Sequence, residues 1–260
     1  MKLMAYLQTE GRIAVMRRLS QAAYDITLFA PELAGAAIPG QFVHIRCGEQ
    51  PLRRPISICA IDRKNGALRL VFEVRGKGTE WLSKRQVGEP LDVLGPLGNG
   101  FSLPEDGEGI LLVGGGIGTP PLLGVAQALS GKAEAILGFR NADACILARD
   151  FALACANVQI ATDDGSLGYH GLVTDLLQAR ISQEKPCSGI LACGPRPMLM
   201  AVSALAQEYH IPCQVSLEER MGCGVGACLV CACKTKEADG EHYRHVCKDG
   251  PVFDAKEVVW

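Results

Sequence analysis

The stretch Ile110–Pro121 reads ILLVGGGIGTPP and joins an apolar run to a glycine turn and two prolines. The apolar run is typical of a buried strand, and prolines suit the first turn of a helix, where a missing N–H costs nothing. Such a turn lets backbone N–H groups and a helix N-terminus meet a pyrophosphate. It departs from the G-x-G-x-x-G pattern, because Thr119 stands in place of the third glycine. The stretch predicts an α/β domain with a candidate nucleotide site.

The same region carries no charged residue from 109 to 131, a length that could span a membrane. Its glycines and Pro120-Pro121 sit in the middle, where a lipid-exposed backbone would lose hydrogen bonds that it cannot replace. We therefore expect a buried strand, a turn and a helix, and no membrane segment. The net charge of −2 leaves no basic field to attract nucleic acid.

Further apolar runs downstream alternate with helical stretches, which predicts parallel strands with crossover helices. We expect a Rossmann-like domain over residues 101–217. The runs lie at 135–139, 158–161, 190–192 and 214–217.

The first hundred residues have a different rhythm. Short runs rich in β-branched and aromatic residues are separated by turn formers, and Asn65-Gly66 between two of them indicates a hairpin. Many short strands with few helices predict an antiparallel β-barrel over residues 1–100. The Gly- and Pro-rich segment 95–109 is the expected boundary. Residues 218–260 are too few for a core of their own, so a metal centre is their expected staple.

Residues 1–12 show no apolar core followed by a cleavage site, so we expect a cytoplasmic protein. In a reducing compartment, clustered cysteines favour metal binding or catalysis over disulfides. The chain has 260 residues, 48% of them hydrophobic, and twelve cysteines.

Four cysteines follow the spacing Cys223-x4-Cys228-x2-Cys231, and fifteen residues then separate Cys231 from Cys247. This is the plant-type arrangement for a [2Fe–2S] centre, and the small residues between the thiols let the loop wrap closely around inorganic sulfide. A rival interpretation is zinc held by Cys228, Cys231, Cys247 and either His242 or His245, and structural disulfides are another. Cys233 is expected to be a buried non-ligand, because its side chain would point away from that of Cys231 in an extended segment.

Other short motifs could meet anions. Arg53–Ser57 could hold phosphate and ring atoms of a flavin, although a surface basic pair needs no ligand. Gly76–Thr79, which precedes an expected helical stretch at 80–84, is a second candidate anion cradle. Cys193–Pro195 closes a predicted strand, at the sheet edge where ligands sit, but also suits a plain strand–helix turn. Asp163–Ser166 faces the same edge, and solvated loop carboxylates are the simpler interpretation.

Together these motifs resemble the ferredoxin–NADP reductase-like superfamily and, more closely, the electron-transfer subunits of type B, NAD-dependent dihydroorotate dehydrogenases. The resemblance covers nearly the whole chain. The cysteine motif is what narrows the match from the superfamily to these electron-transfer subunits. The motifs are RRPIS (53–57), GKGT (76–79), GPLGNGF (95–101), GGGIGTPP (114–121), CGPRPM (193–198) and EERMGCGVGACLVCAC (218–233).

The resemblance implies FAD in the barrel, NAD(H) in the Rossmann-like domain and a [2Fe–2S] cluster in the C-terminal segment. It places the flavin beside Arg54, Pro55, Ile56, Ser57, Val71, Phe72 and Glu73, with its pyrophosphate at Gly78 and Thr79. It places NAD(H) at Gly115, Gly116, Gly118 and Thr119, with Cys193, Gly194 and Pro195 near the nicotinamide. It assigns the cluster to Cys223, Cys228, Cys231 and Cys247. Ser57 as a hydrogen-bond partner of the flavin ring and Cys193 as part of the hydride pocket are hypotheses for catalysis.

The resemblance also implies a partner subunit that carries FMN and oxidises dihydroorotate in pyrimidine biosynthesis, in a heterotetramer, with electrons passing through the cluster and FAD to NAD⁺. Arg140 stands where a carboxylate would favour NAD over NADP, so the choice of NAD rests on the resemblance. Three alternatives stay open: an electron-transfer subunit of a hydrogenase or sulfide dehydrogenase, a self-sufficient NADH-dependent reductase, and a zinc-stapled interaction protein.

Overall fold

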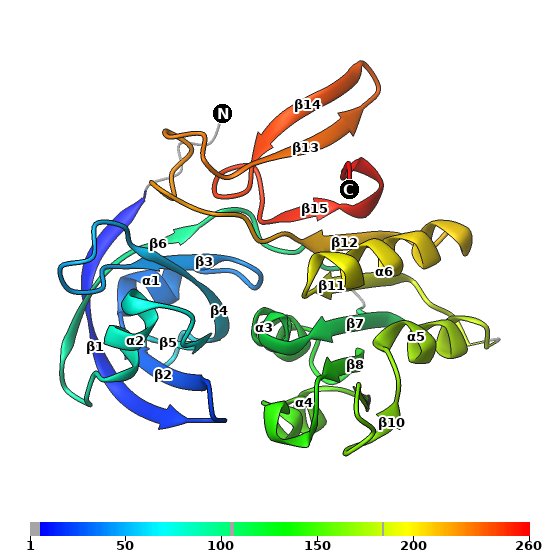
Figure 1. Ribbon diagram of the computed structural model, residues 1–260, viewed down its shortest axis with the longest axis horizontal. Helices are drawn as coiled ribbons and strands as arrows, with labels where there is room; N and C mark the ends of the chain where they lie inside the picture. Colours follow the sequence, from blue (N-terminus) through cyan, green and yellow to red (C-terminus); the bar gives the residue numbers. More distant parts are fainter. Residues whose placement is uncertain (1–5, 105–106, 184) are drawn as a thin grey trace.

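The computed structural model describes residues 6–104, 107–183 and 185–260 (Figure 1). Residues 1–5 of the N-terminal stretch and residues 105–106 of the boundary segment lie outside this description, as does residue 184. The described chain forms a β-barrel, then a mainly parallel sheet with helices on both faces, then a C-terminal hairpin. The predicted fold class is confirmed.

Within the described residues the barrel closes in the order β1-β2-β5-β4-β3-β6, with antiparallel pairing throughout. Alternation along the strands fills its core: in β3, Val43 and Ile45 point inward, whereas Phe42 packs outside the barrel. The expected hairpin at Asn65-Gly66 joins β4 to β5. The elements are β1 (Leu7–Arg18), β2 (Ala23–Phe29), α1 (Pro31–Ala36), β3 (Phe42–Ile45), β4 (Arg54–Asp62), β5 (Ala67–Glu73), α2 (Lys77–Ser83) and β6 (Pro90–Leu97).

The second sheet has the order β10-β9-β8-β7-β11-β12-β15, and every described pair in it is parallel except β12 with β15. Its strands are β7 (Ile110–Gly115), β8 (Glu134–Phe139), β9 (Asn157–Thr162), β10 (Tyr169–His170), β11 (Gly189–Cys193), β12 (Cys213–Ser216) and β15 (Val252–Asp254). Its helices are η1 (Gly116–Gly118), α3 (Pro120–Ala128), η2 (Ala142–Ala144), α4 (Ala148–Ala154), α5 (Val173–Ile181), α6 (Arg196–Glu208) and η3 (Ala255–Glu257).

Helices α3 and α4 cover the face of the sheet toward the barrel, and α5 and α6 cover the other face (Figure 1). Helix α3 packs directly on β4, and a side chain at Gly124 would meet the Cys59 carbonyl oxygen at 3.1 Å. The two domains are therefore in close contact along the strand that carries the RRPIS motif.

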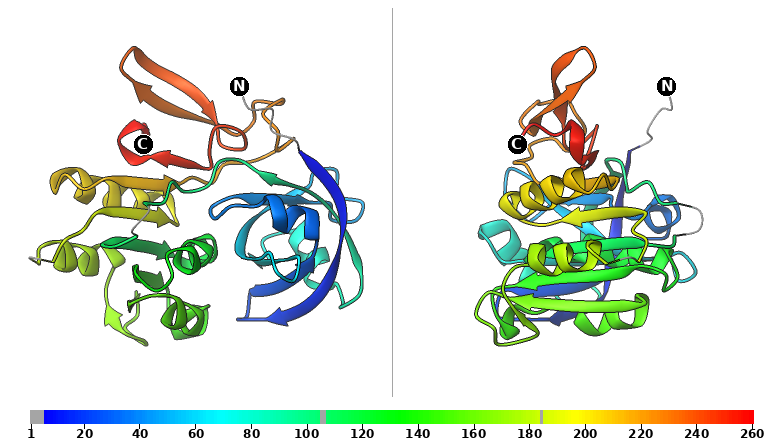
Figure 2. Two further views of the ribbon diagram at one scale, coloured as in Figure 1. Left: turned by 180° about the vertical axis from the view of Figure 1, so that it is seen from behind. Right: turned by 90° about the vertical axis from the view of Figure 1, so that its right-hand side faces the viewer.

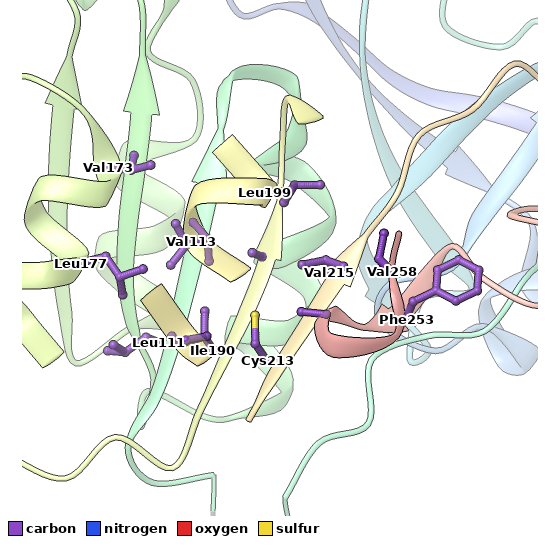
Figure 3. Packing of buried hydrophobic residues seen from close by; sticks show 14 of the residues in the cluster. Leu111, Val113, Val173, Leu177, Ile190, Leu199, Cys213, Val215, Phe253 and Val258 are labelled. Carbon is purple, nitrogen blue, oxygen red and sulfur yellow. The ribbon is translucent and has the colours of Figure 1, made fainter. Parts of the chain in front are cut away.

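The C-terminal residues form the hairpin of β13 (Ala232–Glu237) and β14 (Gly240–His245), which projects from the two larger layers (Figure 2). The chain then returns to the second sheet through β15. Figure 3 shows Phe253 and Val258 of this tail beside Val215 of β12, within one buried apolar cluster. Residues beyond 250 thus contribute to the core of the second domain.

One helix begins earlier than expected. The sequence predicts a helical stretch at 80–84 after the GKGT motif, whereas α2 begins at Lys77. The Thr79 hydroxyl accepts hydrogen bonds from the backbone N–H groups of Arg75 and Gly76, at 2.9 and 3.2 Å, and so closes the first turn around the glycines. The motif is therefore part of the helix.

Candidate functional site

The four candidate cluster ligands lie in two pairs. The N–H of Cys223 donates to the sulfur of Cys228 at 3.3 Å, and the N–H of Cys247 donates to the sulfur of Cys231 at 3.4 Å. In a binuclear cluster each of the two bridged irons takes two protein ligands. Two thiol pairs drawn from a loop and from a distant segment are therefore the arrangement that such a cluster needs.

The loop between β12 and β13 points backbone donors at these sulfurs. Cys223 accepts from the N–H groups of Val225 and Ala227 at 3.4 and 3.2 Å, and Cys247 accepts from Gly226 at 3.1 Å. Gly224 and Gly226 have φ of +76° and +80°, in the left-handed region that a side chain disfavours. Hydrogen bonds from N–H groups to anionic sulfur stabilise thiolates, so the loop fits an iron–sulfur cluster.

The pKa values of two of these thiols also fit a metal-binding role. Burial opposes ionisation of Cys223, but the N–H groups of Val225 and Cys228 outweigh it and lower the pKa to about 7. Burial and then the neighbouring Cys231 raise the pKa of Cys247 to about 12. Since metal ligation requires thiolates, Cys247 needs a bound cation to ionise at neutral pH.

The two histidines of the zinc interpretation both pair with carboxylates. Among the described residues, no three His, Cys, Asp or Glu side chains come together around a single ion position. His242 binds Asp239 at 2.9 Å within the hairpin, and His245 faces Asp249 at 3.5 Å. All twelve cysteines are free, so there is no disulfide among the described residues either.

Cys233 lies in β13 and is buried. Burial, followed by the nearby Glu219, raises its pKa to about 11. A thiol in this state behaves as a small apolar side chain. Its role as a non-ligand stays a prediction.

On the barrel, the two arginines of the RRPIS motif have different surroundings. Arg53 forms a bidentate ion pair with Asp92 at 2.9 and 2.8 Å, which commits it to holding β6. Arg54 uses Nη1 on the Leu52 carbonyl, while its Nε lies 2.5 Å from where a Cβ of Gly78 would be. The fold thus brings Arg54 and the GKGT turn together as a candidate anion cradle, with Gly78 directly against the guanidinium.

The other predicted flavin residues divide by strand alternation. Ser57 is half-buried on the outer face of β4, opposite Phe42, whereas Ile56 enters the barrel core. Val71 points toward the second domain, while the Phe72 side chain stacks on Tyr24 inside the barrel at 5.8 Å between ring centroids. Phe72 could therefore meet a flavin only through its backbone. Pro55 is exposed, and Glu73 binds Arg75 at 3.1 Å.

The two glycine turns of the second sheet touch each other. A Cβ at Gly118 would lie 2.6 Å from the Cys193 carbonyl oxygen and 2.5 Å from the Cα of Gly194. A Cβ at Gly115 would lie 2.9 Å from Pro195 Cδ. The predicted NAD(H) residues are thus gathered at one point of the sheet edge.

Thr119 holds this turn in place. Its N–H and hydroxyl both donate to the Gly116 carbonyl oxygen, at 3.1 and 2.9 Å. The turn η1 also packs against β5, which carries Val71. Burial raises the pKa of Cys193 to about 12, so its thiol stays neutral and can only shape the pocket or donate weakly.

The chain is similar to known proteins over nearly its whole length. A family model described as the iron–sulfur cluster binding domain of dihydroorotate dehydrogenase B matches residues 218–259. The electron transfer subunit of dihydroorotate dehydrogenase B (NAD(+)) from Desulforamulus reducens is 41% identical, over 96% of this chain and 98% of the relative. The subunit of the same name from Geobacillus kaustophilus is 44% identical, over 95% of this chain and 96% of the relative.

The chain belongs to the family of dihydroorotate dehydrogenase B (NAD(+)) electron transfer subunits.

Solved structures with a similar fold include two reductases. A chain from the NADH-dependent reduced ferredoxin-NADP oxidoreductase, studied for flavin-based electron bifurcation, is 32% identical with a TM-score of 0.86, over 96% of this chain and 90% of that one. The ferredoxin reductase of carbazole 1,9a-dioxygenase shares the fold, with 22% identity and a TM-score of 0.66, over 80% of this chain and 66% of that one.

These findings confirm several predictions for this member of the dihydroorotate dehydrogenase B electron transfer family. The chain is an oxidoreductase component, an electron-transfer subunit that works with a catalytic partner. The cofactor set of a [2Fe–2S] cluster, FAD and NAD(H) is borne out by the family and the fold. No helix in the described chain is long and apolar enough to cross a membrane.

One region near the site was not predicted from the sequence. A cavity of about 700 Å³ lies between the start of α6 and the C-terminal hairpin. It is lined by Gly194 and Pro195, and also by Glu218, Glu219 and Trp260. In the sequence, this cavity is signalled only by Glu218 and Glu219, which precede the cysteine motif. They line a cavity only because the C-terminal tail, which ends at Trp260, folds back over them.

Proposed function

We propose that this subunit takes electrons released by dihydroorotate oxidation at the FMN of a catalytic partner and delivers them to NAD⁺, in a cytoplasmic heterotetramer that serves pyrimidine biosynthesis. When bound, the cluster carries single electrons, and FAD exchanges them for the electron pair that nicotinamide takes as hydride. The observation that carries the proposal is the position of the two thiol pairs. Their loop touches β3, and β3 pairs with β4, the strand of the RRPIS motif.

The residues of the chain bind and orient in this scheme. Arg54, with Gly78 and Thr79 at the start of α2, holds the flavin pyrophosphate. Ser57 on the outer face of β4 donates a hydrogen bond to the flavin ring. The touching turns at Gly115–Thr119 and Cys193–Pro195 hold NAD(H). Backbone N–H groups of the cysteine loop stabilise the four cluster thiolates.

The partner binds where the cysteine loop meets solvent. Cys228 is exposed there, and Leu229 and Val230 leave 60% and 57% of their surfaces uncovered. Adjacent exposed apolar side chains mark an interaction surface, and a short path between centres favours electron transfer at this point. The reducing cytoplasm suits a chain whose twelve cysteines are all free.

The test is reconstitution with an FMN-containing dihydroorotate dehydrogenase catalytic subunit. We expect dihydroorotate-dependent NAD⁺ reduction only when both subunits are present, and a complex that Leu229→Asp weakens. As a matched control, Leu153→Asp changes a leucine that is 82% exposed on α4 and should leave the complex intact. Full activity of this chain without a partner would contradict the proposal. So would specific assembly with a hydrogenase subunit instead.

A further inference from the structure

His44 is a fully buried polar side chain in an apolar layer between the barrel and the cysteine loop. It follows Phe42 at the period of two that places both side chains on the outer face of β3. Phe42 belongs to the same buried cluster as Cys231 and Cys247, and its ring meets the imidazole edge to face at 6.4 Å. The His44 ring therefore faces the cluster segment and not the barrel core.

The ring lies against the loop at its first cysteine. A Cβ at Gly224 would lie 2.6 Å from Nδ1 of His44 and 3.1 Å from Cε1. The backbone of Cys223 is close enough to act on the ring, and Gly224 leaves room for that approach. The imidazole thus touches the backbone of a cluster ligand.

By distance and angle, neither ring nitrogen of His44 makes a well-formed hydrogen bond within the described residues. The backbone of Cys223 favours a proton on the ring, but its geometry falls short of such a bond. Leaving a buried donor unpaired costs about 1–3 kcal/mol, so an imidazole in an apolar layer needs a partner. The ring carries at least one N–H whether it is neutral or protonated, so a donor is available in either state.

His44 also lies next to the flavin side of the barrel. It stands opposite Pro55 on β4, and Phe42 stands opposite Ser57. Directly opposed residues of antiparallel strands share a face, so His44, Pro55 and Ser57 lie on one surface. A group on this surface that holds the cluster loop also fixes the distance from the loop to the flavin strand.

We propose that His44 donates a ring N–H hydrogen bond to a sulfur at the Cys223 corner of the bound cluster and so raises the cluster's reduction potential. Reduction adds negative charge to the sulfurs, and a donor to sulfur therefore favours the reduced state. His44 acts as a positioning residue. The inference rests on the cluster ligation proposed above.

The test compares His44→Leu with His44→Asn in the full chain bound to its catalytic subunit. Asn keeps an N–H near the position of Nδ1, whereas Leu fills similar space without a donor. In a redox titration followed by EPR, we expect His44→Leu to stabilise the reduced cluster about ten-fold less, a potential lower by about 59 mV. We expect His44→Asn to restore most of that shift at unchanged iron content. Equal potentials in both variants and the parent would overturn the inference and assign His44 a packing role.

A second measurement observes the contact directly in the parent protein. In protein labelled with ¹⁵N-histidine, the reduced cluster should show a hyperfine coupling to one histidine nitrogen, which His44→Asn removes. A cluster with normal EPR and no ¹⁵N coupling would refute the role of His44 and leave the proposed function intact. Absence of iron and of any EPR signal would instead refute the proposed function.

Discussion

The nucleotide turns and the cysteine loop both depend on glycine, but for different reasons. At Gly118 the chain needs glycine because another backbone, that of Gly194, lies within 2.5 Å of a Cβ position. At Gly226 it needs glycine because φ is +80°, which turns the N–H toward the sulfur of Cys247. The first glycine lets two segments of protein pack, and the second points a backbone N–H at a candidate cluster ligand.

The nucleotide turns and the cysteine loop also differ in what stabilises them. The turns are held by Thr119 and by strands whose apolar side chains are fully buried. The cysteine loop packs against Cys247, whose thiol does not ionise at neutral pH without a cation. We expect the nucleotide sites to persist without metal and the loop to depend on it.

The largest effect should come from Cys247→Ser. Losing one thiolate removes half of the Cys231–Cys247 pair, and dihydroorotate-dependent NAD⁺ reduction should fall at least a thousand-fold as the cluster is lost. NADH-dependent dye reduction through FAD should remain. Cys213→Ser, a buried cysteine in β12, is the control and should keep its iron. Loss of both activities together in Cys247→Ser would show that the regions are not separable.

A buried ion pair lies inside the nucleotide domain. Glu134 is 7% exposed and pairs with Arg180, itself 3% exposed, at 2.9 Å. Glu134→Gln should lower the free energy of unfolding by about 3 kcal/mol, because it leaves a buried guanidinium without its charge partner. Thermal unfolding measures it, and Glu10→Gln on the barrel surface should have little effect.

The ion pair of Glu134 and Arg180 also makes the stability of the protein depend on pH in the acid range. Arg180, against the opposing effect of burial and with the help of Lys185, lowers the pKa of Glu134 to about 2. A depressed carboxyl pKa stabilises the fold above the unfolded-state pKa of about 4.3 and loses that contribution as the pH falls toward 2. The stability difference between the parent and Glu134→Gln should therefore shrink below pH 4. A difference that is constant from pH 7 to pH 3 would refute this assignment.

Gly118→Ala should have a smaller but selective effect. The added methyl group meets the backbone of Gly194 and Cys193, which cannot move as a flexible side chain would. We expect kcat/KM for NADH to fall about 30-fold, equal to about 2 kcal/mol, with the EPR signal of the cluster unchanged. Gly35→Ala in α1, where nothing lies within 4 Å, is the matched control. An unaffected KM and kcat would place the nicotinamide elsewhere.

The smallest effect is expected from Ser57→Ala. Removing one hydrogen bond to the flavin ring should slow NADH oxidation about ten-fold while FAD stays bound, because Arg54 and the α2 turn hold the pyrophosphate. Stopped-flow flavin reduction measures it, with the exposed Ser182→Ala as control. A rate equal to that of the parent would remove Ser57 from the mechanism.

Local patterns predicted much of this molecule. The apolar runs around Ile110–Pro121 and the turn at Asn65-Gly66 act over a few residues, and the structure has strands, helices and a hairpin there. The spacing of the cysteines and of the glycines between them is also a signal that acts over a few residues. Such signals are visible without knowing what packs against them.

What was missed depends on distant partners. The strand β6 reads PLDVLGPL, whose prolines and glycine suggest a turn, yet pairing with β1 and β3 makes it a strand. The short β15 is defined by pairing with β12. His44 looks like any polar residue in a strand until the loop at Gly224 covers it. The direction of the Phe72 side chain likewise required the barrel to be closed.

The central claim is that the two thiol pairs of this chain hold a binuclear iron–sulfur cluster. The direct measurement is metal and sulfide analysis of anaerobically purified protein, with EPR before and after dithionite. We predict about two irons and two sulfides per chain and a signal that appears only on reduction. Zinc in place of iron, or iron with no signal after reduction, would contradict the account.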